Sequence, residues 1–301
     1  MRPGRVVDCA VCRSVRILTR LAVNLVPSNT RIAVLIRPVT ESISGQLVFL
    51  GTGTSHGVPM IGCGCETCTS SDPRNHRTRC AVALGLPEGN LLIDAPPELR
   101  LQLLRERIGL IHAVAFTHAH ADHLFGLDDL RIFPRYLGHE VPIYCREAVE
   151  RRIRRAFDYA FDPSVQAYAG GGIPQLTFRS IDSAPFEILG ATIVPVPLEH
   201  GRYECLGFRI GNVAYCTDVK TIPEASVRLL AGLDVLVLDC LRDEEHPTHM
   251  NYNEAMAAIA RLRPKRTFLT HLCHDLEHEA TMKRLPPGVE AAYDGLRILL
   301  T

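Results

Sequence analysis

The chain has 301 residues, of which 47% are hydrophobic, so it can form one large domain or two smaller ones around a sizeable core. Its 33 basic residues balance 33 acidic ones, which argues against partners held mainly by charge, such as nucleic acid or an anionic membrane. No apolar run approaches the roughly 18 residues of a membrane span, so we expect no membrane partner. Eleven cysteines in a chain of this length do not indicate the disulfide framework of a short secreted protein, so we expect a cytoplasmic location.

The first 44 residues differ in composition from the rest of the chain. They hold seven arginines and only two acidic residues, Asp8 and Glu41. Basic, acid-poor sequence is typical of targeting segments, but no long apolar stretch with a small-residue cleavage site stands out. We expect residues 1–44 to form a poorly ordered extension, with an organelle signal as the alternative, and residues 45–301 to form the globular domain.

Short apolar runs bounded by turn signals predict many strands after residue 45. The predicted strands cover residues 46–50, 91–93, 113–116, 141–145, 176–178, 192–194, 207–210, 213–216, 235–238, 267–269 and 296–300. Helical spacing of apolar residues predicts helices at residues 96–108, 125–130, 146–159, 223–230, 252–262 and 275–284. Because both element types occur in both halves, without a repeat or linker, we expect an α/β (α+β) fold with two packed sheets and helices outside.

The segment that follows the predicted strand 113–116 carries the clearest chemical signal. It places three imidazoles and a carboxylate within six residues, at His118, His120, Asp122 and His123. Neutral imidazole and carboxylate are ligands that suit zinc, manganese or iron. Sites in layered α/β folds tend to lie on loops that leave the strands. The sequence therefore predicts a metal site on this loop.

Other predicted strands also deliver a polar residue at one end. Four such residues follow short apolar runs: Asp94, Asp218, Asp239 and His271. A single aspartate in such a place often only caps a loop or forms a turn. Several buried strands that each end in a potential ligand favour one shared site.

Two sets of residues resemble the metallo-β-lactamase superfamily. The first is its histidine signature, His118-x-His120-x-Asp122-His123. The second comprises later residues in that family's order, namely His200, Asp218 and His271. The resemblance implies an αββα sandwich, in which two mixed β-sheets are flanked by helices and a dinuclear metal site lies between the sheets.

Within the superfamily, the chain resembles the PhnP-like phosphoribosyl cyclic phosphate phosphodiesterases. Three segments carry this closer similarity: the opening loop 51–59, the cysteine insert at 62–80 and the continuation 126–131 after the histidine signature. The similarity covers roughly residues 46 to 300 and has no counterpart for the first 44 residues. A branch of a family does not by itself fix a substrate.

The resemblance implies that seven residues hold two divalent ions, manganese or zinc. The first ion would be bound by His118, His120 and His200. The second would be bound by Asp122, His123 and His271. Asp218 would bridge the two ions, and Asp122 is also expected to act in catalysis. Two divalent cations outweigh two aspartates and one hydroxide, so the centre would keep a positive charge that favours an anionic substrate.

The resemblance also implies a general acid, which would protonate the leaving oxygen. His249 is the candidate because it lies before a predicted helix and 22 residues ahead of His271. His246 is the competitor, and either residue could merely cap the helix. Asp94 and Asp239 are candidates to orient metal-bound imidazoles from behind.

The cysteine insert offers three thiolates in six residues, at Cys63, Cys65 and Cys68. Tetrahedral zinc requires a fourth ligand, and the branch pattern selects His274. We expect a structural zinc there, with an incidental or redox cysteine cluster as the alternative.

Arginines near both motifs are candidates for contact with a substrate phosphate, because a guanidinium can bind phosphate through two hydrogen bonds. These candidates are Arg74, Arg77 and Arg131. The alternative for each is a solvated surface arginine.

The function implied is hydrolysis of a small cyclic phosphodiester, either phosphoribosyl 1,2-cyclic phosphate or a cyclic nucleotide, by attack of a metal-bridging hydroxide. The alternatives are tRNA 3′-end processing, hydrolysis of a thioester or β-lactam, and a non-hydrolytic relative. The balanced charge argues against strong RNA affinity. A homodimer is implied only by the resemblance.

Overall fold

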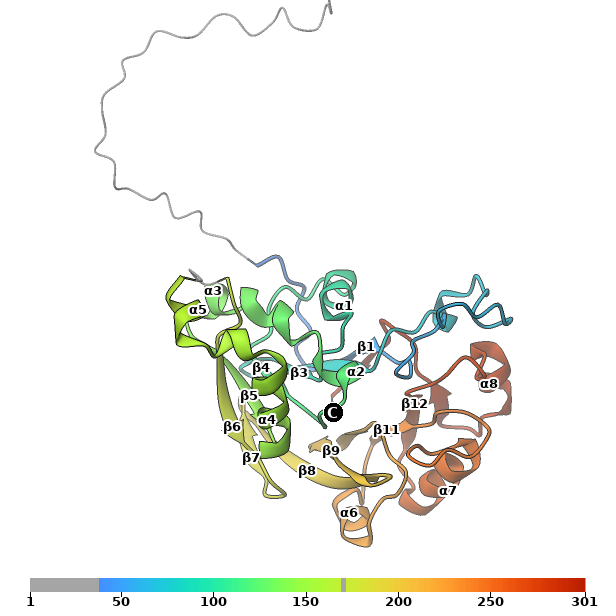
Figure 1. The fold of residues 1–301 in the computed structure, drawn as a ribbon. Helices are drawn as coiled ribbons and strands as arrows, with labels where there is room; N and C mark the ends of the chain where they lie inside the picture. The colour runs from blue at the N-terminus through green and yellow to red at the C-terminus, as the bar shows by residue number, and fades with distance from the viewer. Residues whose placement is uncertain (1–37, 169–171, 301) are drawn as a thin grey trace, which may run out of the picture. The chain divides into compact units, whose positions relative to one another are not determined.

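The computed structural model describes residues 38–168 and 172–300. The prediction for residues 1–44 therefore lies almost wholly outside the described residues. The described chain forms two seven-stranded β-sheets with helices beside them (Figure 1). No helix within these two ranges is both long enough and apolar enough for a membrane span.

The first sheet has the strand order β14-β1-β2-β3-β4-β5-β6. Its strands are β1 (Gln46–Gly51), β2 (Ala81–Leu86), β3 (Gly89–Ile93), β4 (Ala113–Ala115), β5 (Val141–Cys145), β6 (Leu176–Ser180) and β14 (Arg297–Leu299). Pairing is antiparallel from β14 to β3 and parallel from β3 to β6. The sheet is therefore mixed.

The second sheet has the order β13-β12-β11-β10-β9-β8-β7. Its strands are β7 (Phe186–Ile188), β8 (Ala191–His200), β9 (Tyr203–Ile210), β10 (Val213–Cys216), β11 (Val235–Asp239), β12 (Arg266–Thr270) and β13 (Val289–Ala291). Strands β10 to β13 are parallel, whereas β7 to β10 are antiparallel. Three neighbouring parallel strands, β10, β11 and β12, thus present their carboxyl ends at one edge.

The helices flank both sheets (Figure 1). Those of the first half are α1 (Leu99–Arg105), α2 (Ala121–Leu124), α3 (Pro134–Leu137), α4 (Glu147–Ala156) and α5 (Pro163–Tyr168), with short 3₁₀ turns at Pro73–Asn75, Leu127–Ile132 and Asp158–Ala160. Those of the second half are α6 (Glu224–Leu229), α7 (Tyr252–Leu262) and α8 (His278–Arg284). Helix α7 begins with a capping box, in which Asn251 and Glu254 bond to each other's backbone N–H groups.

Alternation of side chains along the strands produces three apolar layers. In β1, Leu47 and Phe49 face the second sheet, whereas Val48 and Leu50 face the helices of the first half. The strands of the second sheet divide in the same way between the central layer and the layer beneath α6 and α7. The central strands of each sheet, such as β2, β4, β10 and β11, are buried on both faces, so they read as continuous apolar runs. The predicted αββα sandwich is confirmed.

Three strands had no recognised signal in the sequence: β2, β7 and β13. The sequence of β2, AVALGL, is poor in β-branched residues, yet every residue of it is buried because tertiary packing outweighs propensity. At Gly85 a Cβ atom would lie 1.9 Å from the carbonyl oxygen of Ile43, so only glycine fits. The helix predicted at 125–130 is instead a 3₁₀ segment at Leu127–Ile132, and α8 begins three residues later than predicted.

Candidate active site and metal centres

Strand ends from both sheets meet at one place. The chain leaving β4 carries the histidine signature, His200 ends β8, and Asp218 and His271 follow β10 and β12. Asp218 and His271 have φ values of 55° and 60°, and Asp94, after β3, has a φ of 66°. Non-glycine residues seldom adopt this left-handed conformation, and such strain gathers at functional sites.

Two groups of potential ligand atoms result, which together we call the His–Asp cluster. In each group the ligand atoms lie within 4.8 Å of one another. The first group comprises His118, His120, His200 and Asp218. The second comprises Asp122, His123, Asp218 and His271. The structure thus brings together all seven residues that the resemblance implies, with Asp218 shared by both groups.

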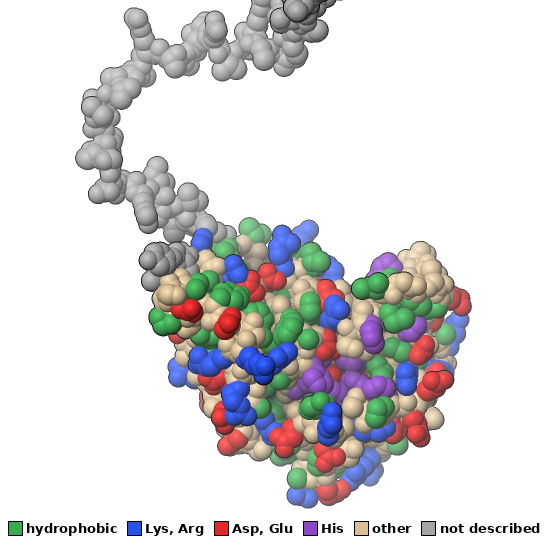
Figure 2. All heavy atoms as spheres, in the orientation of Figure 1, with side chains coloured by type: hydrophobic (Ala, Val, Ile, Leu, Met, Phe, Trp, Pro, Cys, Tyr) green, Lys and Arg blue, Asp and Glu red, His purple; other side chains and the backbone are tan. Residues whose placement is uncertain are grey.

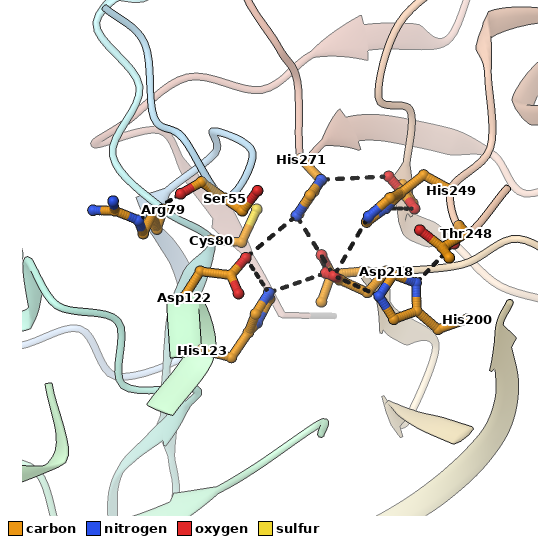
Figure 3. Close-up of polar contacts among 12 residues, drawn as sticks. Ser55, Arg79, Cys80, Asp122, His123, His200, Asp218, Thr248, His249 and His271 are labelled. Atoms are coloured by element: carbon orange, nitrogen blue, oxygen red, sulfur yellow. Dashed lines mark hydrogen bonds and ion pairs between the residues drawn. The ribbon is translucent and has the colours of Figure 1, made fainter. Parts of the chain in front are cut away.

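Asp218 lies at the centre of the cluster (Figure 3). Its Oδ1 is 3.2 Å from the Nε2 of His123, and its Oδ2 is 3.6 Å from the Nε2 of His200 and 3.5 Å from that of His271. Burial alone would raise the pKa of Asp218, but the imidazoles of His123 and His271 hold it well below the usual range. Asp218 is therefore a carboxylate at neutral pH, available to two ligand groups at once.

Three of the histidines, His118, His123 and His200, have Nε2 toward Asp218 and Nδ1 beside an outward partner. The Nδ1 of His123 donates to Asp94 Oδ2 at 2.8 Å, and the Nδ1 of His200 donates to the carbonyl oxygen of Thr248 at 2.7 Å. The Nδ1 of His118 lies 2.9 Å from the hydroxyl of Thr117. Outward bonds of this kind fix the tautomer that leaves Nε2 free for a metal.

The cluster fits divalent cations on the chemistry of these donors. The Nε2 atoms of His118, His123 and His271 are buried and lack a hydrogen-bond partner among the described residues, which is costly unless something else satisfies them. Burial lowers the pKa of His118 and His200, so both are neutral and offer a lone pair. Imidazole and carboxylate together suit zinc or manganese.

Of the two supporting aspartates, Asp94 hydrogen-bonds a predicted ligand, His123, whereas Asp239 hydrogen-bonds His249 and lies 3.9 Å from the Nδ1 of the predicted ligand His271. Asp94 accepts from His123 and from both the backbone N–H and the hydroxyl of Thr117. Asp239 accepts from the Nδ1 of His249 at 2.8 Å and from the backbone N–H of Val219. Both carboxyl groups are fully buried, so they hold imidazoles in place without facing solvent.

The structure separates the two candidates for the general acid. His249 stacks on His271 with ring centroids 4.4 Å apart, and its Nε2 is 4.0 Å from Asp218 Oδ2. Burial opposes protonation of His249, but Asp239 outweighs it and raises the pKa to about 9. His246 instead accepts a hydrogen bond from the backbone N–H of Thr248, and burial lowers its pKa. Of the two candidates, therefore, His249 both contacts the His–Asp cluster and holds a proton at neutral pH.

The cysteine insert forms a second cluster, which we call the cysteine cluster. The Sγ atoms of Cys63 and Cys65 both lie 3.3 Å from the Nδ1 of His274, and Cys68 completes a group whose ligand atoms are within 4.8 Å. The backbone N–H of Cys68 and the ring of His274 lower the pKa of Cys65 to about 6. Three thiolates and one imidazole match a closed tetrahedral zinc site.

The arginine candidates lie away from the His–Asp cluster. Arg74 pairs with Asp72 and Glu279, and Arg131 pairs with Asp128. Arg77 is only 1% exposed, and its guanidinium donates to the carbonyl oxygen of Ala292. Because a buried guanidinium presents nothing to a substrate, the expectation for Arg77 is wrong, and the arginine instead ties the insert to the interior.

Two open hollows flank the His–Asp cluster. The first, of about 270 Å³, lies between the loop after β1 and the segment that carries His246 and His249. The second, of about 520 Å³, reaches His118 and His120 from the side of α4 and the β8–β9 turn. Figure 2 shows the histidine side chains gathered in one exposed depression of this face. Sequence reasoning missed Thr117, Thr248 and Tyr203 around it, because contacts of a backbone carbonyl or an exposed ring leave no pattern in the sequence.

Comparison with known proteins agrees with this geometry. A family model described as a beta-lactamase superfamily domain matches residues 89–272. A crystal structure described as a new diphosphatase from the PhnP family is 42% identical, with a TM-score of 0.78, and covers 84% of this chain and 96% of its own.

Two curated relatives have other names. An octanoyltransferase of Porphyromonas gingivalis is 34% identical over 85% of this chain, which spans about half (51%) of that relative's length. A coenzyme PQQ synthesis protein B of Methylorubrum populi is 30% identical over 64% of this chain and 72% of its own. The family match, the fold and the His–Asp cluster agree, and the chain therefore belongs to the beta-lactamase superfamily, within which it is similar to the PhnP family.

Proposed function

We propose that the chain is a phosphodiesterase that hydrolyses a small phosphodiester with two divalent cations, manganese or zinc, held by the His–Asp cluster. The observation that carries this proposal is the position of Asp218, which is shared by two ligand groups within 4 Å of His249. Cations bound there would polarise phosphoryl oxygens and lower the pKa of a coordinated water. Similarity to a PhnP-family diphosphatase supports chemistry at phosphorus.

His249 supplies the proton in this proposal. Hydrolysis joins a water oxygen to phosphorus and breaks the bond from phosphorus to the leaving oxygen, which must then be protonated. His249 carries its transferable proton on Nε2, because its Nδ1 is committed to Asp239. Asp239 also stabilises the charged imidazolium until the proton leaves. His249 then recovers a proton from solvent.

Replacing His249 tests the acid directly. We expect His249→Ala to lower kcat for an alkyl phosphodiester by ~10²–10³-fold, within the usual range for a general acid. The same change should slow bis(p-nitrophenyl) phosphate less than about tenfold, since nitrophenolate leaves without a proton. His246→Ala is the matched control and should slow neither substrate by more than a few-fold. Equal slowing of both substrates by His249→Ala would contradict the acid role.

The cysteine cluster is assigned a structural zinc in the same proposal. His274 lies three residues after His271, so a closed site there joins the insert to the rim of the His–Asp cluster. If the three cysteine sulfurs and the His274 ring all bind one ion, no coordination position remains for substrate. In this proposal the cysteine cluster maintains the shape of the active-site rim and takes no part in the reaction.

A further inference from the structure

The second hollow contains positive charge that the proposed chemistry does not use. Three arginines line it, together with the loop that carries His118 and His120: Arg146, Arg152 and Arg202. Arg146 pairs with the exposed carboxylate of Glu204. Within the described parts of the chain, no carboxylate lies within ion-pair distance of Arg152 or Arg202.

Helix α4 carries both paired and unpaired arginines, and Arg155, like Arg152, has no carboxylate within ion-pair distance among the described residues. On α4, Arg151 pairs with Glu147 and Arg154 pairs with Glu150, each four residues away. Arg152 lies between these two neutralised arginines yet faces the hollow. Figure 2 shows basic side chains gathered beside the histidines on this face. Guanidinium groups free of carboxylates next to a hydrolytic centre are suited to a second anionic group of the substrate.

Flat surfaces accompany the charge. The guanidinium of Arg202 lies 5.4 Å from the ring centroid of Tyr203, and that of Arg152 lies 5.5 Å from the ring centroid of Phe125. Tyr203 is 47% exposed and Phe125 is 42% exposed, and they are the two aromatic members of the large exposed hydrophobic side chains in the described residues. The ring of Tyr203 also meets that of His120 edge-on at 5.1 Å.

Guanidinium planes and exposed aromatic rings are the surfaces on which nucleobases stack. A sugar phosphate without a base needs only the charge. Here the exposed ring of Tyr203 and the arginines line one hollow of about 520 Å³, within the ~300–1,000 Å³ range typical of ligand pockets, whereas Phe125 only contacts Arg152. The hollow opens directly onto His120, so a group bound in it remains next to the reacting phosphate.

We propose that this hollow binds the nucleotide portion of the substrate, with Arg152 and Arg202 taking a phosphate other than the one that is hydrolysed and Tyr203 lying against the base. This rests on the proposed function, because it names what the scissile phosphodiester is attached to. The substrate class is then a nucleotide-containing phosphodiester rather than a cyclic phosphate of a bare pentose.

Binding of adenosine 5′-monophosphate and ribose 5-phosphate tests this proposal, since ribose 5-phosphate carries a hydroxyl in place of the base. We expect titration calorimetry on the metal-loaded chain to show adenosine 5′-monophosphate binding at least about tenfold tighter than ribose 5-phosphate. The double variant R152A/R202A should lose at least about tenfold in affinity for the nucleotide. Arg151→Ala, on the next position of α4, is the matched control and should bind as the wild type does.

Two results would overturn the nucleotide site. One is equal affinity of the wild-type chain for the two probes. The other is unchanged nucleotide affinity in R152A/R202A. Both replaced side chains are exposed, so we expect the double variant to melt with the wild type, and its melting curve verifies that any lost affinity is local.

Turnover distinguishes this proposal from the function on which it rests. Nucleotide binding as expected, with no hydrolysis of any phosphodiester, would contradict the proposed function and leave the nucleotide site standing. Hydrolysis of bis(p-nitrophenyl) phosphate, with nucleotide affinity independent of the two arginines, would overturn the nucleotide site and leave the proposed function standing. If both proposals hold, kcat/KM for adenosine 5′-phosphate 2′,3′-cyclic phosphate, which carries a phosphate besides the one that is hydrolysed, should fall about tenfold in R152A/R202A relative to that for bis(p-nitrophenyl) phosphate.

Discussion

The His–Asp cluster and the cysteine cluster lie close together in sequence at their carboxyl-terminal ligands, but the fold builds them in different ways. The His–Asp cluster takes its ligands from the ends of four strands, and its central residue, Asp218, is 1% exposed. The cysteine cluster takes three of four ligands from one irregular loop, and Cys63 and Cys65 are both partly exposed. We therefore expect the strand-end ligands of the His–Asp cluster and the loop ligands of the cysteine cluster to have different roles.

This difference predicts which losses affect chemistry and which affect local order. Ligands on strand ends are held by both sheets, so replacing one should leave the fold intact and remove the reaction. Ligands in an irregular loop hold that loop together, so replacing one should loosen the insert and leave the reaction nearly intact. Replacements of Asp218 and Cys65 test these two expectations.

Replacing Asp218 should have the largest effect. We expect Asp218→Ala to lower kcat/KM by more than about 10³-fold, because both ligand groups lose their shared member. Melting temperature should fall only modestly, because alanine tolerates the left-handed backbone at this position less well than aspartate, while both sheets still hold the strands around it. Asp243→Ala is the control, an exposed aspartate paired with Arg284. Retention of even a tenth of wild-type turnover in Asp218→Ala would contradict the assignment of this residue.

Replacing Cys65 should have the opposite profile. We expect Cys65→Ser to lower the melting temperature by at least about 4 °C, which is on the order of 1–2 kcal/mol for a domain of this size. Limited proteolysis should cleave within residues 62–80 faster than in the wild type, and kcat/KM should change less than about threefold. An unchanged melting curve with unchanged proteolysis would rule out a structural zinc.

Lowering the pH should also weaken the anchor of the insert. His278 at the start of α8 donates its backbone N–H to Asn75 and lies beside the guanidinium of Arg77. Burial, and then Arg77, lowers the pKa of His278 to about 4, below about 6.5 for an unfolded chain. The unfolded chain thus binds the proton more readily, so this contribution is fully present above pH 6.5 and is lost as the pH falls toward 4.

The size of that contribution is up to about 3 kcal/mol between pH 7 and pH 4. Urea unfolding of the wild type at several pH values measures it. His278→Gln should flatten the dependence over this interval, whereas His76→Gln, at an exposed position, should leave it unchanged. A pH dependence that persists in His278→Gln would assign the effect to another group.

The sequence predicted the framework of the site better than its surroundings. Most strands that end in a ligand were recognisable as apolar runs, because strands buried on both faces are continuously apolar. The shared role of Asp218 and the fourth ligand His274 came only from resemblance, since spacing alone does not say which distant residues meet. The structure places them where the family pattern requires.

Residues whose role depends on tertiary packing could not be predicted. Nothing in the sequence distinguishes Arg77 from a surface arginine, yet the fold buries it. Its backbone packs against Gly53, where a Cβ atom would lie 2.7 Å from the carbonyl oxygen of Arg77. Strand β2 was missed because alanine and glycine make up half of it and only one residue is β-branched. Tyr203 and the unpaired Arg152 could not be recognised from the sequence, because only the fold brings α4 and the β8–β9 turn together at the same hollow.

The metal content of the wild type and of Asp218→Ala is the most direct test of whether the His–Asp cluster binds two ions that share Asp218. We expect inductively coupled plasma mass spectrometry of the wild type to find one ion for each half of the His–Asp cluster and one zinc for the cysteine cluster. We expect Asp218→Ala to keep the zinc of the cysteine cluster and to lose most of the rest. A wild-type chain with zinc in the cysteine cluster alone, or an Asp218→Ala variant with undiminished metal, would contradict the account.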